Sequence, residues 1–392
     1  MAKNTARTIV MVAGESSGDL YGAKVVEAIA ARAPQIKFYG IGGKGMRSKG
    51  VRLLASSDEL AVVGVTEVLA KAGKIWKAWR GMRRFIKDQK PHLAVLIDYP
   101  GFNLRLAKLF HAHAVPVLYY VSPQVWAWRS GRIKKIAKRV SKMAVILPFE
   151  APLYKKAGVD AEFVGHPLLD ILETGLTRHE ARRRLEVSRD TLLIGLLPGS
   201  REQEVKGLLP PLIGAAKILK RDFPSSRFII PLASTIRKDE VQGLIARAAQ
   251  GAQGAQGALP VEIVEGRTFE VMRAADCLLV VSGTATLEGA IAGAPMVIIY
   301  RLSPITYLIG RMLVNVRCIG LANIVVGKKV VPELLQDEVT PQRIAREAKA
   351  ILQNAAKRKA IKGEFQRIRN KLGGRGAAQR VARMALQMMG VR

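Results

Sequence analysis

Short apolar runs alternate along the chain with longer stretches in which apolar residues recur at helical spacing. The runs that we expect to form strands are TIVMVA (8–13), KFYGIG (37–42), HLAVLID (92–98), VPVLYYV (115–121), MAVILPF (143–149), LLIGLLPG (192–199), RFIIPLA (227–233), VEIVEG (261–266), CLLVVSG (277–283) and MVIIY (296–300). Nearly continuous apolar strands that are separated by helices indicate parallel sheets covered by helices on both faces.

This alternation falters between residues 165 and 190, where strand signals are few and a basic helix follows. We therefore predict an α/β protein of two Rossmann-like, doubly wound domains that face each other across a cleft. The first would comprise residues 1–170, with the helical tail 366–392 packed back on it, and the second residues 171–365. In such sheets, ligands bind beyond the carboxyl ends of the strands.

The charge of the chain changes the range of expected partners. Lysine and arginine total 63 against 31 acidic residues, a net charge of +32. Such a field favours anionic partners: nucleic acid, an anionic membrane surface or phosphorylated substrates.

The two cysteines, Cys277 and Cys318, have neither zinc spacing nor a disulfide framework. Because no apolar stretch reaches the ~18 residues of a membrane span and the run 8–13 is too brief for a signal peptide, we expect a cytoplasmic protein.

Two loops of the second predicted domain carry the parts of an anion site. In PGSRE (198–202) a strand ends and a helix opens with a glycine, a hydroxyl and a guanidinium, which suits a pyrophosphate. In SGTATLEGAIAGAP (282–295), first-turn amides and hydroxyls again suit phosphate, and Glu288 can accept both hydroxyls of a ribose. Singly, each residue can be read as an ordinary cap or a surface ion pair; together the loops predict a nucleotide diphosphate site. Its candidate residues are Gly199, Ser200, Arg201, Ser282, Gly283, Thr284, Thr286 and Glu288.

The segment LIDYPGFN (96–103) places Asp98 at the end of a buried strand. A partly desolvated carboxylate at this position can act as a general base on a hydroxyl. We favour this hypothesis over a carboxylate that only caps a helix or pairs with Arg105. Pro100 and Gly101 turn the chain, and Asn103 is a candidate cap of the next helix.

Two further loops are candidate ligand contacts. GESSGD (14–19) follows the first strand and opens a helix that Asp19 can cap, and it matches neither a Walker A loop nor GxGxxG. A plain turn and a ligand loop are both open here. SPQVWAWR (122–129) follows another strand; its tryptophans fit packing at a domain edge, whereas Ser122 and Gln124 are placed to touch a ligand. The first loop contributes the candidates Gly14, Glu15, Ser16, Ser17 and Asp19.

The segment 65–90 predicts a basic amphipathic helix with aromatic residues. This composition is typical of an interfacial membrane binder, although an ordinary helix that covers the sheet fits the pattern as well. The residues that we expect to contact membrane or acyl chains are Trp76, Trp79, Met82 and Phe85. The repeat AAQGAQGAQGA (248–258) reads as a surface loop without chemistry.

In their order along the chain, these motifs resemble those of the lipid-A-disaccharide synthase family, glycosyltransferases of the two-Rossmann (GT-B) architecture. The resemblance rests on GESSGD, DYPGFN, SPQVWAWR, FVGHPL, LPGSREQEV, SGTATLE and ANIVV (322–326), and it extends from about residue 8 to the tail. The repeat at 248–258 and the high charge are not part of it.

The resemblance implies an inverting transfer in lipopolysaccharide biosynthesis of Gram-negative bacteria. UDP-2,3-diacylglucosamine and 2,3-diacylglucosamine 1-phosphate would give the β-1,6-linked disaccharide 1-phosphate and UDP, without metal or cofactor. Asp98 would be the base, Arg201 would stabilise the leaving UDP, Asn323 would face the donor, and the 14–19 loop would face acceptor or sugar. The substrates imply a peripheral position at the anionic inner leaflet, and the C-terminal helices offer a homodimer contact.

Two other classes of function stay open at this point. One is another UDP-sugar enzyme of the same fold, such as a peptidoglycan-precursor N-acetylglucosaminyltransferase or a UDP-sugar epimerase. The other is a non-catalytic binder of polyanions or membrane, for which the charge argues; the paired phosphate loops argue against it.

Overall fold

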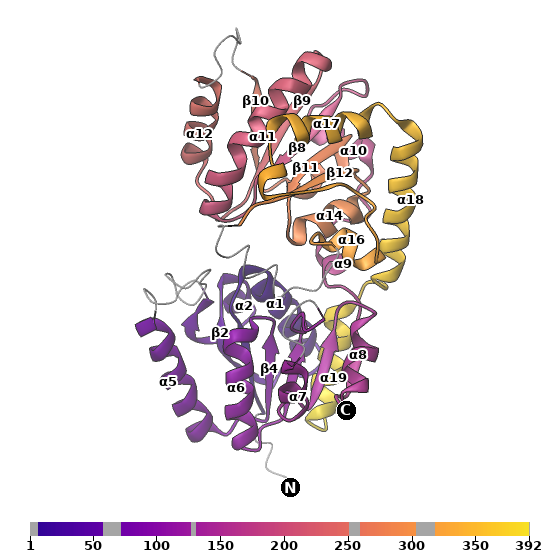
Figure 1. Ribbon diagram of the computed structural model, residues 1–392. Coiled ribbons are helices and arrows are strands. Elements are labelled where there is room, and N and C mark those ends of the chain that lie inside the picture. Colours follow the sequence, from indigo (N-terminus) through magenta and orange to yellow (C-terminus); the bar gives the residue numbers. More distant parts are fainter. Residues whose placement is uncertain (1–6, 58–71, 127–130, 251–258, 303–317, 392) are drawn as a thin grey trace. The chain divides into compact units, whose positions relative to one another are not determined.

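The computed structural model describes residues 7–57, 72–126, 131–250, 259–302 and 318–391 (Figure 1). Its contacts divide the chain into two compact units. Unit 1 comprises Met1–Ile171 and Leu372–Arg392, and unit 2 comprises Leu172–Lys371. The C-terminal segment thus returns to the unit in which the chain begins, and each unit has its own parallel sheet.

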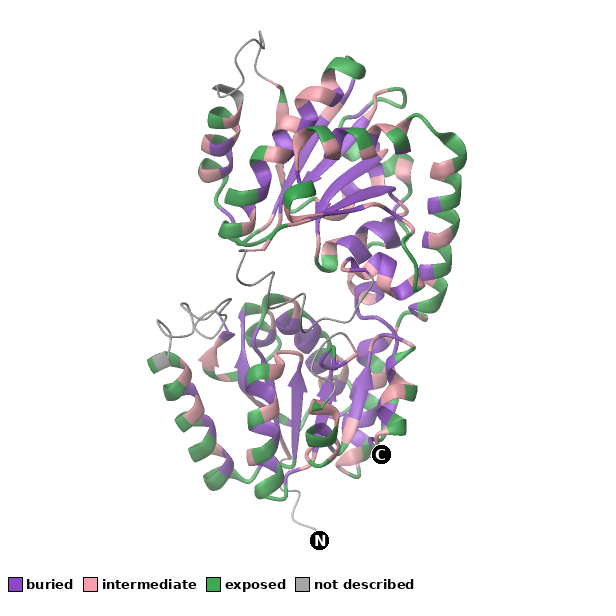
Figure 2. Cartoon of the chain, in the orientation of Figure 1, coloured by how far each residue is buried: buried purple, intermediate pink, exposed green. Residues whose placement is uncertain are grey.

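Unit 1 contains a seven-stranded sheet in the order β3-β2-β1-β4-β5-β6-β7, and all neighbouring strands are parallel. The strands are β1 (Thr8–Ala13), β2 (Lys37–Gly42), β3 (Arg52–Ser56), β4 (Leu93–Ile97), β5 (Val117–Tyr120), β6 (Lys142–Val145) and β7 (Ala161–Phe163). Strands β1, β4 and β5 are almost wholly buried, which confirms the interpretation of their continuous apolar runs (Figure 2). The two edge strands β3 and β7 were not predicted, because β3 mixes polar with apolar residues and β7 is only three residues long.

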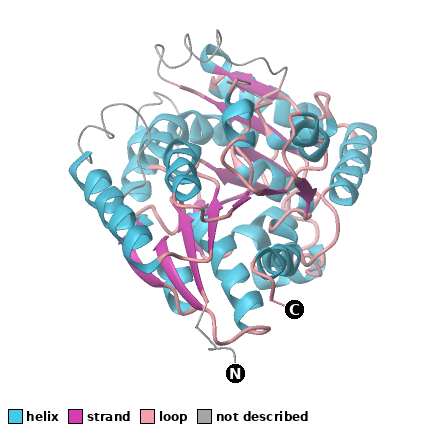
Figure 3. Cartoon of the chain, turned by 90° about the horizontal axis from the view of Figure 1, so that it is seen from below, coloured by secondary structure: helices cyan, strands magenta, loops and turns pink. Residues whose placement is uncertain are grey.

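Helices cover both faces of this sheet (Figure 3). They are α1 (Ser16–Ala30), α2 (Lys44–Ser48), α5 (Ala72–Gln89), α6 (Pro100–Ala112), α7 (Arg132–Ala137), α8 (Glu150–Lys156), α9 (Leu168–Ile171) and α19 (Ala377–Met388). One core lies under α1 and α19, which pack against each other. The other core lies under α5, α6, α7 and α8.

Unit 2 repeats this architecture with a six-stranded parallel sheet in the order β10-β9-β8-β11-β12-β13. Its strands are β8 (Leu193–Leu197), β9 (Arg227–Leu232), β10 (Val261–Glu265), β11 (Cys277–Val281), β12 (Met296–Tyr300) and β13 (Glu333–Leu335). Its helices are α10 (Arg178–Arg184), α11 (Glu202–Asp222), α12 (Lys238–Gln250), α13 (Thr268–Ala274), α14 (Thr284–Ala292), α16 (Leu321–Val326), the 3₁₀ turn η1 (Gln336–Glu338), α17 (Pro341–Leu352) and α18 (Ala355–Lys371). This strand order is that of the Rossmann fold, so the predicted fold of two parallel α/β domains is confirmed.

Some predicted features lie outside the described residues. The predicted helix 65–90 is observed as α5 from residue 72 onward, and residues 65–71 are not described. Residues 127–129 of the SPQVWAWR motif and residues 251–258 of the repeat are likewise not described. Within the described part of the chain, no helix combines the length and apolarity that crossing a bilayer requires.

Candidate functional site

The candidate site of unit 1 lies where the sheet reverses its strand order. The chain leaves β1 into α1 on one face and leaves β4, the neighbouring strand, into α6 on the other face. A crevice forms at such a switch point, beyond the carboxyl ends of the two strands. The loop that begins at Gly14 follows β1, and Asp98 follows β4, so both predicted motifs border the switch point of unit 1.

Asp98 is partly buried and directly follows β4. The pKa of its carboxyl is raised to about 7, mainly by burial and in addition by the negative charges of Glu15 and Glu150, while a backbone hydrogen bond from Tyr99 opposes the shift. A carboxyl whose pKa lies near 7 can accept a proton at neutral pH and still be substantially ionised beforehand. No ion pair joins Asp98 to Arg105 in the described structure, so the alternative of a surface pair has no support.

The first loop packs tightly against the turn at Asp98. A Cβ atom on Gly14 would lie 2.3 Å from the ring of Tyr99, so only glycine fits there without displacing that ring. Glu15 and Ser16 are exposed and Ser17 is half-buried, which leaves these side chains open to a ligand.

Asp19 caps a different helix from the one predicted. It lies inside α1, and its buried carboxylate accepts backbone N–H groups from Gly43 at 2.6 Å, Gly45 at 2.8 Å and Met46 at 3.1 Å. The carboxylate therefore caps α2 and ties the loop after β2 to α1. The prediction that Asp19 caps its own helix is therefore wrong. The start of α2 presents three amides without helical partners to this side chain, and the carboxylate binds those instead.

The loop after β5 is held by Glu150, which the sequence did not reveal. Glu150 is 2% exposed, and its carboxylate accepts from the Ser122 hydroxyl at 2.8 Å, the Trp126 indole N–H at 3.1 Å and the Leu147 N–H at 3.1 Å. Burial raises the pKa of Glu150, and these hydrogen bonds oppose the rise. Ser122 is thus engaged inside the unit, whereas Gln124 remains exposed.

In unit 2, β8 and β11 are the neighbouring strands at the switch point, and the two predicted anion loops follow them. Gly199 has a φ of +113°, and a Cβ there would lie 2.5 Å from a Glu204 carboxylate oxygen. That carboxylate accepts the Ser200 N–H at 3.3 Å and pairs with the Arg201 guanidinium at 2.9 Å. Ser200 and Arg201 are exposed. The loop therefore already presents an amide and a guanidinium to a carboxylate, the type of group that a phosphate would replace.

The second loop of unit 2 is only partly available to a ligand. Gly283 and Thr284 are exposed at the start of α14. Ser282 donates to the Ile319 carbonyl at 3.1 Å, and the buried Thr286 donates to the Gly283 carbonyl at 2.8 Å, so these hydroxyls shape the loop. Burial raises the pKa of Glu288, and its hydrogen bond with Thr284 opposes the rise.

Asn323 has an internal role in place of the predicted contact with the donor. It is fully buried, and its amide donates to the Val331 carbonyl at 3.0 Å and to Glu333 at 2.8 Å. Its oxygen accepts the N–H groups of Val330 at 2.8 Å and Val331 at 3.1 Å. Both donors and the acceptor are thus occupied, which is why the side chain cannot also reach a ligand.

The amphipathic helix α5 covers the sheet, which was one of the two alternatives left open, and this limits the side chains that were expected to contact membrane or acyl chains. Met82 is fully buried in the core, Trp79 lies edge-on to Phe102 at 6.0 Å, and Phe85 lies 4.9 Å from the ring of Tyr39. Met82 therefore covers the sheet and is not free to contact a bilayer. Trp76, by contrast, is 58% exposed.

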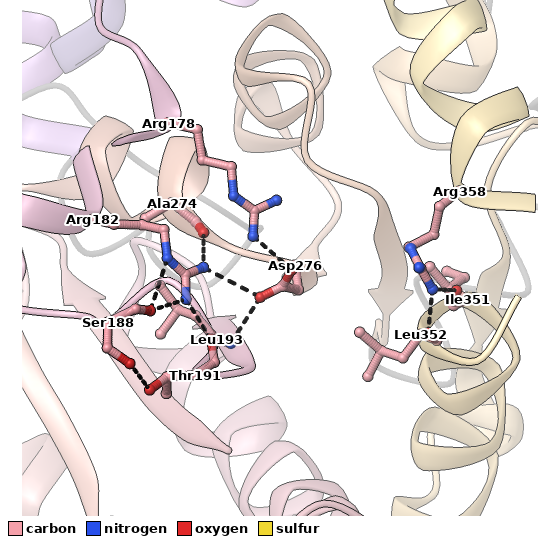
Figure 4. A network of polar contacts seen from close by, with 10 residues as sticks. All are labelled: Arg178, Arg182, Ser188, Thr191, Leu193, Ala274, Asp276, Ile351, Leu352 and Arg358. Atoms are coloured by element: carbon pink, nitrogen blue, oxygen red, sulfur yellow. Dashed lines mark hydrogen bonds and ion pairs between the residues drawn. The ribbon is translucent and has the colours of Figure 1, made fainter. Parts of the chain in front are cut away.

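A polar network at the amino ends of the central strands of unit 2 has a structural role (Figure 4). Asp276 directly precedes β11; it accepts from Arg178 at 2.6 Å, from the buried Arg182 at 3.4 Å and from the Leu193 N–H at 3.0 Å. Arg182 also donates to the Ser188 carbonyl at 2.7 Å. This network fixes the amino ends of β8 and β11, whereas the two predicted anion loops follow the carboxyl ends of these strands. Among the described residues, no cluster of histidine, cysteine or carboxylate side chains is arranged to hold a metal ion.

Comparison with known sequences identifies the relatives of this chain. The sequence model of a family described as lipid-A-disaccharide synthetase matches residues 9–387. The lipid-A-disaccharide synthase of Syntrophus aciditrophicus is 47% identical over 383 residues, which cover 98% of both chains. The enzyme of the same name from Trichlorobacter lovleyi is 44% identical over 389 residues and 99% of both chains.

Solved structures with the same fold are more distant in sequence. A putative UDP-N-acetylglucosamine 2-epimerase from Listeria monocytogenes has a TM-score of 0.64 at 12% identity, and the match covers 98% of this chain and 97% of that one. A calicheamicin glycosyltransferase has a TM-score of 0.59 at 14% identity over 98% of both chains. At this identity the likeness establishes the GT-B fold and nothing about the substrate.

Proposed function

The chain belongs to the lipid-A-disaccharide synthase family, and from this membership we propose that it joins UDP-2,3-diacylglucosamine to 2,3-diacylglucosamine 1-phosphate. The products are the β-1,6-linked disaccharide 1-phosphate and UDP. The observation that carries the proposal is the family match over residues 9–387. The putative UDP-N-acetylglucosamine 2-epimerase, by comparison, shares the fold at only 12% identity.

Asp98 is the general base of the proposed reaction. Its carboxylate takes the proton of the acceptor's 6-hydroxyl while that oxygen attacks C1 of the donor sugar from the face opposite UDP. The C1–O bond to UDP breaks, its electrons leave with the diphosphate, and the configuration at C1 is inverted. The raised pKa of Asp98 supports this role, because it makes the carboxylate a stronger base than an exposed aspartate.

Unit 2 binds the UDP group in this proposal. The Ser200 amide and the Arg201 guanidinium would release Glu204 and bind the diphosphate, with the exposed start of α14 at Thr284 as a second donor. These groups can stabilise the charge that develops on the leaving diphosphate without a metal ion. Glu288 would accept hydrogen bonds from the ribose hydroxyls.

The reaction itself is tested by product analysis with the purified protein. With both acylated substrates, we expect the disaccharide 1-phosphate and UDP in equal amounts, measured by mass spectrometry and nucleotide chromatography. Unacylated UDP-N-acetylglucosamine is the matched control and should give no product. If the protein epimerised that control substrate, or transferred its sugar to a peptidoglycan precursor, the proposal would be wrong.

We also infer a peripheral position at an anionic membrane surface on the cytoplasmic side, through the basic side of α5. Arg83 and Arg84 are exposed, and the guanidinium of Arg80 lies 4.4 Å from the ring centroid of the exposed Trp76. Each cation near such a surface contributes about 1 kcal/mol. A homodimer through the C-terminal helices stays a prediction.

Vesicle binding tests this surface. Arg83→Gln combined with Arg84→Gln should weaken binding to phosphatidylglycerol vesicles roughly 30-fold at low salt, from about 1 kcal/mol for each lost charge. The matched control is Lys155→Gln with Lys156→Gln, which removes two exposed cations from α8. Equal effects of the two double variants, or binding that does not respond to salt, would rule out a specific contact through α5.

A further inference from the structure

The turn that carries Asp98 has an unusual backbone. Asp98 has a φ of +47° and Tyr99 a φ of +48°, so two consecutive residues other than glycine adopt the left-handed region. Each such residue costs on the order of 1–3 kcal/mol and persists only where the surrounding structure holds it. This turn leads directly from β4 into α6, whose first residue is Pro100.

Two buried side chains hold the carbonyl group of Asp98. The Tyr119 hydroxyl on β5 donates to it at 2.6 Å, and the Asn103 amide in α6 donates to it at 2.7 Å. The same amide donates to the carbonyl of Ile97 at 3.1 Å. Burial raises the pKa of Tyr119 well above its ordinary value, so its hydroxyl keeps its proton and stays a donor throughout the working pH range.

The burial of Asn103 costs folding free energy that a purely structural position would not require. It is fully buried, and its Oδ1 has no hydrogen-bond partner among the described residues. A buried acceptor without a partner costs about 1–3 kcal/mol, a cost that an apolar side chain of similar size would avoid. What asparagine contributes here is an amide that donates to the carbonyls of Asp98 and Ile97, and at 3.5 Å to that of Val12.

We propose that Tyr119 and Asn103 are positioning residues for the sugar transfer, since they fix the left-handed turn and thereby the direction of the Asp98 carboxylate. The inference rests on the proposed function in that Asp98 is taken as the base. Neither residue touches a reacting atom. Proton transfer depends steeply on the position of the base, and a displacement of about 1 Å can cost about 10²-fold in rate.

The test compares two neighbouring tyrosines. Tyr119→Phe removes only the hydroxyl that holds the Asp98 carbonyl, and we expect kcat for disaccharide formation to fall about 10- to 100-fold. The donor KM and the affinity for UDP should stay within twofold. Tyr120→Phe is the matched control, because the Tyr120 side chain is equally buried and its hydroxyl has no hydrogen-bond partner in the described structure. Its kcat should be unchanged.

A second variant separates positioning from folding. Asn103→Leu removes both the N–H donors and the unpaired Oδ1, so we expect a fall in kcat similar to that of Tyr119→Phe with a change in Tm of only a few degrees. A loss of UDP affinity and Tm in parallel with kcat would show a structural role and overturn the inference. So would a kcat of Tyr119→Phe within twofold of the unchanged protein, or an equal loss in Tyr120→Phe.

A readout that does not need turnover keeps this inference distinct from the proposed function. Amide hydrogen exchange of the segment 97–103, measured by mass spectrometry, should be faster in Tyr119→Phe than in Tyr120→Phe. Failure of the unchanged protein to form disaccharide would reject the proposed function alone. Identical exchange rates in the two variants would show that the Tyr119 hydroxyl does not hold the turn at Asp98, whatever their activities.

Discussion

Asp98→Asn is expected to lower kcat for disaccharide formation by about 10²- to 10⁴-fold, the range typical of a lost general base. The carboxamide keeps the size of the side chain but cannot take the proton of the acceptor hydroxyl. UDP affinity should not change, because the proposed UDP contacts lie in unit 2. The measurement is single-turnover kinetics with saturating donor, together with calorimetric titration of UDP. A variant that retained a tenth or more of the rate would remove Asp98 from the base role.

The same carboxyl predicts the pH dependence of the reaction. Its pKa is raised to about 7 by burial first and then by Glu15 and Glu150, and only the ionised form is a base. We therefore expect kcat/KM to rise with pH up to about 7 and to level off above it, while the residual activity of Asp98→Asn should lack this rise.

The contribution of Asp98 to stability depends on pH in the opposite direction from its contribution to kcat/KM. Its pKa rises from an ordinary value of 3.8 to about 7 on folding, so the stabilising contribution is fully present below the lower value and is lost as pH rises through the upper one. Asp98→Asn should consequently gain in Tm relative to the unchanged protein between pH 5 and pH 8. This gain also controls for unfolding as a cause of lost activity.

Arg201→Ala is expected to lower kcat by about 10²- to 10³-fold, which corresponds to about 3–4 kcal/mol of lost transition-state stabilisation. The guanidinium would neutralise the charge that builds on the diphosphate as the C1–O bond breaks. Its loss also leaves Glu204 without its cation beside the anion loop, so UDP affinity should fall too. The surface pair itself contributes little to folding, and Tm should hardly change.

Two variants sharpen this test. Arg201→Lys keeps the charge and loses the planar fork, so we expect an intermediate rate. Arg237→Ala removes an arginine of unit 2 whose side chain is 76% exposed, and it should leave kcat unchanged. If Arg201→Ala and Arg237→Ala gave the same rate, the proposed role of the 198–202 loop in stabilising the leaving UDP would be wrong.

Most of the sheet framework could be predicted from the sequence. Strands such as β4 and β11 are buried along their whole length, so their apolar runs are unbroken and stand out from the helical pattern. The edge strand β13 is only three residues long and could not be recognised. The same pattern placed Asp98 and the 198–202 loop directly after predicted strands. Because ligands bind beyond the carboxyl ends of parallel strands, these positions could be predicted as candidate sites.

Whether a polar residue faces a ligand or the interior could not be predicted in the same way. Asn323, Ser122 and Asp19 are all polar residues in or beside loops, yet each is occupied by a partner from another element: Glu333, Glu150 and the amides of α2. Periodicity gives the face of an element on which a residue lies. It does not give the partner that meets it across the fold.

The sequence by itself determined the parallel α/β framework, the family and the loops at which chemistry is expected, because these depend on local pattern and on order along the chain. Only the tertiary structure decided that Tyr119 and Asn103 hold the Asp98 turn and that Glu204 occupies the anion loop. A hydrogen bond is fixed by distance and direction between atoms, and for side chains from different elements the folded chain alone sets these quantities.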